Sequence, residues 1–154
     1  MVNRALEKTM IRALSSFPAL AILGARQVGK TTLAKQLSGK LKKPVHYLDL
    51  ERPSTLASII REPEEYLASY TNHCVIIDEV QRLPSLFPLL RSIIDEKRKP
   101  ARFIITGSAS PDLLKGASES LAGRVLYCHL NPIGLHELPE TISLKQHWLR
   151  GADP

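Results

Sequence analysis

The residues from Gly24 to Thr31 have the types and the spacing of a loop that binds phosphate groups. They fit the pattern G-x-x-x-x-G-K-[ST]. The two glycines let the loop take backbone angles closed to residues with a Cβ and bring N–H groups up to phosphates. Lys30, expected at the exposed mouth of the loop, would reach the β- and γ-phosphates, and the Thr31 hydroxyl would take one position on Mg²⁺. We therefore expect the chain to bind a nucleoside triphosphate through Gly24, Arg26, Gln27, Val28, Gly29, Lys30, Thr31 and Thr32.

A second run of residues ends in two adjacent carboxylates. Apolar residues from Cys74 to Ile77 predict a buried strand, and Asp78 and Glu79 follow them directly. A core does not tolerate unpaired carboxylates, so these two must emerge where water or a metal can meet them. Asp78 would then hold Mg²⁺ together with Thr31, and Glu79 would polarise the water that attacks the γ-phosphate. We predict Glu79 and Lys30 as catalytic residues.

A third apolar run, from Phe103 to Ile105, ends in Thr106-Gly107-Ser108. If this strand lies between the other two, Thr106 or Ser108 faces the γ-phosphate and the attacking water, and we take Ser108 as a further candidate catalytic residue. A Ser-rich turn leading into a helix that opens at Ser110-Pro111 explains the same residues. Both interpretations stay open.

The alternation of apolar runs and helical patterns predicts an α/β fold. In chain order we expect a helix at about 3–16, a strand at 19–23, a helix to about 41, a strand at 45–50, short helices opened by Pro53 and Pro63, a strand at 74–78, a helix at about 85–99, and strands at 102–106 and 125–130. Continuous apolar strands alternating with helices indicate a parallel sheet covered on both faces. Ligand chemistry then belongs at the carboxyl ends of the strands.

Composition suits one domain of 154 residues, 44% of them hydrophobic. No apolar run approaches the roughly 18 residues of a membrane span, so we expect a cytoplasmic chain without a membrane partner. Of the net charge of +6, residues 1 to 43 carry 9 basic and 1 acidic side chains. Part of that charge suits a polyanionic nucleotide, and a nucleic-acid partner stays open.

Five blocks of residues occur in an order that resembles a known family, namely Gly24 to Leu33, Tyr47 to Glu51, Val75 to Gln81, Ile105 to Ser108 and Leu121 to Arg124. Together they are similar to the AAA-type ATPase domain of a widespread group of bacterial and archaeal proteins. In that group a helical or winged segment and a C-terminal domain of nuclease-like fold follow the ATPase. The resemblance covers roughly residues 15 to 140.

The resemblance implies a three-layer P-loop NTPase fold with a five-stranded parallel sheet in the order 5-1-4-3-2. It implies an ATPase core over 18–140 and the start of a truncated C-terminal segment over 141–154. For residues 1–17, the spacing of apolar residues itself predicts an amphipathic helix. The resemblance also gives Arg124 the place of an arginine finger that reaches the γ-phosphate of a neighbour in a homo-oligomer. A surface arginine at a strand start is the alternative for Arg124.

These observations predict ATP binding and Mg²⁺-dependent ATP hydrolysis. A nucleotide-gated regulatory module with negligible turnover is the first alternative. A DNA-handling motor is the second, because Asp78-Glu79-x-Gln81 resembles the second motif of helicases.

Overall fold

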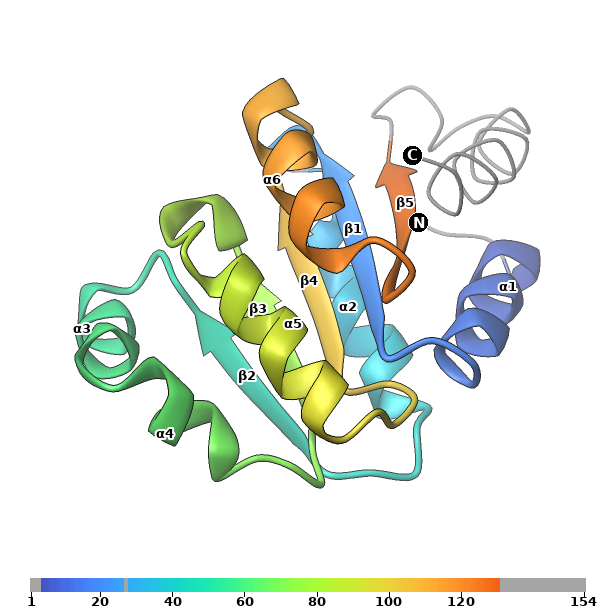
Figure 1. Cartoon of the computed structure of the whole chain (residues 1–154). Coiled ribbons are helices and arrows are strands. Elements are labelled where there is room, and N and C mark those ends of the chain that lie inside the picture. The colour runs from blue at the N-terminus through green and yellow to red at the C-terminus, as the bar shows by residue number, and fades with distance from the viewer. Residues whose placement is uncertain (1–3, 27, 131–154) are drawn as a thin grey trace.

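The computed structural model describes residues 4–26 and 28–130, in which one parallel sheet lies between two layers of helices (Figure 1). The strands are β1 Ala19–Gly24, β2 Val45–Asp49, β3 Cys74–Asp78, β4 Phe103–Gly107 and β5 Val125–Leu130. The helices are α1 Arg4–Leu14, α2 Lys30–Gly39, α3 Pro53–Arg61, α4 Pro63–Ala68, the 3₁₀ turn η1 Val80–Arg82, α5 Leu86–Glu96 and α6 Pro111–Leu121. The predicted elements are confirmed, with α1, α2 and α5 ending two to three residues earlier than the apolar pattern indicated.

The strand order is β2-β3-β4-β1-β5, and every pairing is parallel. This is the predicted order read from the other end, so the fold class and the order are confirmed. In a parallel sheet all strands end at the same edge, which we call the carboxyl edge; the opposite one is the amino edge. The register sets Asp49 beside Asp78 and Leu23 beside Gly107 at the carboxyl edge.

Apolar side chains cover both faces of the sheet. Along β1 and β3 alternate residues point to opposite faces, as the two-residue period of a strand requires. Leu20 and Ile76 pack with α1 and α2, whereas Leu23 and Ile77 pack with α3, α4, α5 and α6. Among the described residues, no helix is long and apolar enough to cross a bilayer.

Strand β2 departs from the expected continuous burial. Val45 is 40% exposed, and only Leu48 of its five residues is fully buried. The reason is its place at the edge of the sheet, where β3 pairs with it on one side. The expectation of strands buried throughout is therefore wrong for β2.

Local signals in the sequence account for the helix starts. Pro53, Pro63 and Pro111 each occupy the first turn of a helix, where proline costs no backbone hydrogen bond. The Ser110 hydroxyl accepts a hydrogen bond from the N–H of Leu113 at 3.2 Å and caps α6, which opens at Ser110-Pro111 as the Ser-rich turn indicated. Helix α6 starts at the carboxyl edge of the sheet, so its first turn lies near the ends of the strands (Figure 1).

Candidate nucleotide site

The two loop glycines are required for different reasons. Gly29 has φ of 90°, a left-handed conformation, and directly precedes the first residue of α2. Gly24 has no such φ; instead, a Cβ added there would lie 2.5 Å from the carbonyl oxygen of Leu130 on β5. The expectation of an unusual backbone angle at both glycines is therefore wrong for Gly24, where close strand packing excludes a side chain.

Lys30 is buried rather than exposed. Lys30 is only 4% exposed to solvent, and its Nζ donates to the carbonyl oxygens of Gly24 at 2.7 Å and Ala25 at 3.2 Å. The predicted place at the exposed mouth of the loop is wrong, because the loop folds back over the ammonium group and satisfies it with its own carbonyls. An incoming phosphate would offer this cation a fully charged partner in place of two neutral ones.

The other predicted loop residues divide between core and surface. Val28 packs in the core beside α2, and Thr32 is exposed on the first turn of that helix. The guanidinium of Arg26 lies 3.4 Å from the carboxylate of Glu51, with its side chain 75% exposed. Gln27 lies outside the described residues.

Three hydroxyl groups converge on the carboxylate of Asp78. Thr31 Oγ1 donates to this carboxylate at 2.9 and 3.0 Å from its two oxygens. Thr106 donates to Oδ1 from the neighbouring strand β4, and Tyr47 donates to Oδ2 from β2. Burial, together with the hydrogen bond to Asp78, raises the pKa of the Tyr47 hydroxyl, which therefore stays protonated and remains a donor. The predicted metal ligands Thr31 and Asp78 are thus adjacent.

Glu79 has an uncommon backbone conformation with φ 62° and ψ 54°. A non-glycine residue keeps such a conformation only where its surroundings fix it, and these residues cluster at functional sites. Its N–H donates to Thr106 Oγ1 at 3.0 Å. Its carboxylate Oε1 accepts a hydrogen bond from Gln81 Nε2 at 2.7 Å. Both the backbone and the side chain of Glu79 are therefore held.

The chain is similar to known proteins. Residues 16–139 match the family described as AAA domain. The chain belongs to that family. An uncharacterized protein of Mycobacterium bovis and one of Mycobacterium tuberculosis are each 43% identical to it over 143 residues, which is 93% of this chain and 31% of each relative. The chain therefore spans about a third of the length of these relatives.

Membership in the AAA family indicates nucleotide binding, and the oxygen donors of the site suit the metal that accompanies nucleotides. Mg²⁺ is bound in proteins by one or two carboxylates, with phosphates and water completing its shell. The Asp78 carboxylate and the Thr31 hydroxyl are such ligands, brought into contact at the end of β3 and the start of α2. These residues fit Mg²⁺.

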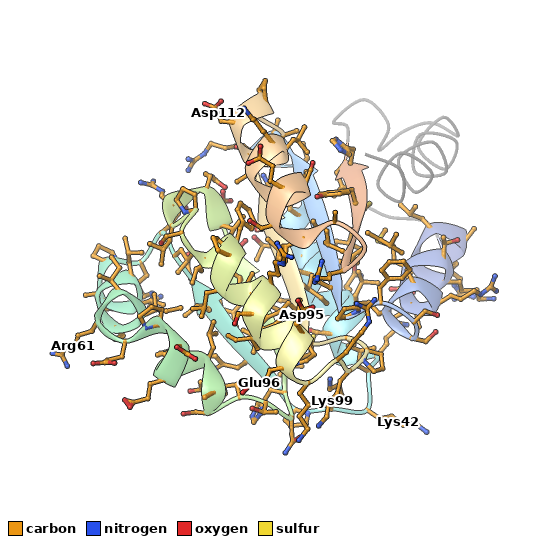
Figure 2. The ribbon with its side chains drawn as sticks, viewed as in Figure 1. Lys42, Arg61, Asp95, Glu96, Lys99 and Asp112 are labelled. Carbon is orange, nitrogen blue, oxygen red and sulfur yellow. The ribbon has the colours of Figure 1, made fainter. Side chains whose placement is uncertain are left out.

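Ser108 and Arg124 lie at opposite edges of the sheet. Ser108 follows β4 and joins the site through its backbone N–H, which donates to Gln81 Oε1 at 3.3 Å. Arg124 precedes β5 at the amino edge, where Nε and Nη2 bond the two oxygens of Asp95 at 2.7 and 2.8 Å. This hydrogen bond holds the pKa of the Asp95 carboxyl low. Figure 2 shows Asp95 on α5, well away from the edge where Asp112 opens α6. Within one chain, Arg124 does not join the other predicted residues.

Sequence reasoning missed two residues of this AAA site. Tyr47 and Gln81 lay in motif blocks without an assigned role, and Thr106 was named only as an alternative to Ser108. Their shared signal is their position, because each lies in or just after a strand near the carboxyl edge. Which side chains meet there depends on strand order and register.

Proposed function

We propose that this AAA domain binds ATP with Mg²⁺ and hydrolyses it to ADP and phosphate. The observation that carries the proposal is the hydrogen bond between Thr31, at the end of the phosphate loop, and Asp78, next to a backbone-constrained Glu79. A loop hydroxyl and a strand-end carboxylate that lie within hydrogen-bonding distance of each other could both bind one metal ion that accompanies a polyphosphate.

Each residue of the site has one role in the proposal. Lys30 exchanges its bonds to the loop carbonyls for the β- and γ-phosphates. Thr31 and Asp78 hold Mg²⁺, which neutralises phosphate charge when bound. Glu79 accepts a proton from the attacking water. Thr106 fixes both carboxylate residues, since its hydroxyl donates to Asp78 and accepts from the N–H of Glu79.

Cellular context forms a further part of the proposal. A cytoplasmic location would supply ATP and Mg²⁺, and it agrees with the buried thiols of Cys74 and Cys128. A homo-oligomer formed through Arg124, a nucleic-acid partner and a nuclease-like C-terminal domain all stay predictions.

The test combines calorimetry with phosphate release, using ATP and GTP with and without Mg²⁺ and DNA. We expect Mg²⁺-dependent binding and slow hydrolysis of ATP. Lys30→Ala should weaken binding by about 100-fold, the scale of two to three kcal/mol for a charged hydrogen-bonding group. Lys40→Ala, at the other end of α2, is the matched control and should bind normally. Because Lys30 is buried, Lys30→Met keeps the stem of the side chain and separates lost binding from lost folding.

Unchanged affinity in a folded Lys30 variant would refute the phosphate-loop assignment. Mg²⁺-dependent ATP binding without any cleavage would leave a nucleotide switch as the function. Equal turnover of ATP and GTP would show that the site reads the phosphates and not the base.

A further inference from the structure

Gln81 connects the Glu79 carboxylate to the end of strand β4. Its side-chain amide donates from Nε2 to Glu79 Oε1 at 2.7 Å and accepts at Oε1 from the Ser108 N–H at 3.3 Å. We propose that Gln81 is a positioning residue that sets the Glu79 carboxylate for attack on the γ-phosphate. The inference rests on the proposed ATPase activity.

The anchor of this connection lies on the strand that separates Glu79 from the phosphate loop. In the order β3-β4-β1, strand β4 is between β3, which carries Asp78, and β1, which leads into the loop. The Ser108 N–H that anchors Gln81 directly follows β4, so the connection holds the Glu79 carboxylate toward β4, the neighbour of β1, and not toward the edge strand β2.

The surroundings of Gln81 are shaped around its amide. A Cβ on Gly107 would lie 2.9 Å from Gln81 Oε1 and 3.2 Å from a methyl of Val80, so a side chain at this position would crowd the Gln81 amide. The 3₁₀ turn that carries Gln81 is fixed by the fully buried side chain of Val80, whereas Arg82 on the same turn is exposed. The turn therefore keeps Gln81 within hydrogen-bonding distance of both Glu79 and Ser108.

Only an amide of this length meets both requirements. The side chain at this position must donate to the Glu79 carboxylate and accept from the Ser108 N–H. The planar amide of glutamine carries both the N–H donor and the oxygen acceptor. Glutamate would place a second negative charge against Glu79 and could not donate. Methionine preserves the length and lacks both bonds, so Gln81→Met removes the connection with little change in volume.

The experiment measures single-turnover ATP cleavage with the 154-residue chain in excess, together with the Kd for Mg²⁺-ATP and the unfolding midpoint. Gln81→Met should slow cleavage by between about 10- and 100-fold, the scale for a misplaced catalytic group, while the Kd stays unchanged. Arg82→Met, on the same turn, is the control and should cleave at the wild-type rate.

A double variant distinguishes positioning from a general structural role. In the Glu79→Gln background, adding Gln81→Met should cause no further loss of rate, because Gln81 acts through the Glu79 carboxylate. A further loss as large as in the wild-type background would overturn the inference, as would wild-type cleavage by Gln81→Met. A wild-type chain that binds ATP without cleaving it would instead refute the proposed hydrolysis, and the positioning role with it.

Discussion

At the amino edge of the sheet, buried cationic side chains bond to backbone carbonyls, whereas at the carboxyl edge polar side chains bond mainly to one another. Arg102 is 2% exposed and donates to the carbonyl oxygens of Ile93 and Lys97 at the end of α5. Lys43, which is only half-buried, donates to the carbonyl oxygens of Pro100 and Ala101. At the carboxyl edge, the Asp78 carboxylate instead receives hydroxyl groups from three different elements.

The difference separates polar groups that complete the fold from polar groups available for chemistry. Carbonyls at a helix end need donors in every state of the protein, so Arg102 has a permanent partner. Hydroxyl groups around a carboxylate can give way to a metal ion, because a doubly charged cation is a stronger partner for a carboxylate than a neutral hydroxyl. Lys30 belongs with the second group even though it bonds to carbonyls, since those carbonyls are part of the phosphate loop. We therefore expect substitutions at the carboxyl edge to reduce activity and those at the amino edge to reduce stability.

The largest effect is expected from Glu79→Gln. The variant keeps the size of the side chain and removes the negative charge that accepts a proton, so cleavage should slow by about 10² to 10⁴-fold. ATP should bind about as well as before and persist uncleaved. Single-turnover cleavage and calorimetry measure the two quantities separately. If binding falls as far as cleavage does, Glu79 is a metal ligand or a structural residue instead.

Arg102→Met should show the opposite behaviour. The variant removes the charged donor from two carbonyl oxygens at the end of α5. This loss should lower the free energy of unfolding by about 1.5 to 3 kcal/mol. Urea denaturation measures this loss, and the Kd for ATP should not change. Arg98→Met is the matched control, because Arg98 is exposed and donates to the single carbonyl of Gly123 at 3.1 Å. A larger effect on ATP binding than on unfolding would break the distinction between the edges.

Much of this arrangement was predictable from local patterns. The strands Cys74–Asp78 and Val125–Leu130 were predicted with their observed bounds, because an apolar run bounded by polar residues marks a buried strand. The strand order came from the family resemblance. Neither source gave the contacts of Tyr47 and Gln81, which depend on register and on the turn after β3. The burial of Lys30 was missed because its partners are carbonyls of its own loop, and sequence does not show where carbonyls point.

Thr106→Val tests a residue that contributes to both fold and site. The variant keeps the shape of a buried side chain and removes the hydroxyl that bonds Asp78 and the N–H of Glu79. Leaving the partly buried N–H of Glu79 without this partner should cost about 1 kcal/mol of stability. ATP cleavage should fall as well, because the left-handed backbone of Glu79 loses its fixed partner. Thermal unfolding and single-turnover cleavage of the same preparation should therefore both change, and a variant with only one defect would assign Thr106 to one role alone.

The smallest effect is expected at the pair of Arg124 and Asp95. Both lie at the amino edge, and their bidentate contact is partly exposed, so we expect Arg124→Ala and Asp95→Ala to lower stability slightly and equally. Neither should change ATP cleavage. An arginine finger acting in trans gives a different result, because Arg124→Ala would lose about 10³ to 10⁵ in rate while Asp95→Ala would not. In that case, mixing Arg124→Ala with Lys30→Ala should restore some cleavage, since one interface would then join an intact loop to an intact arginine.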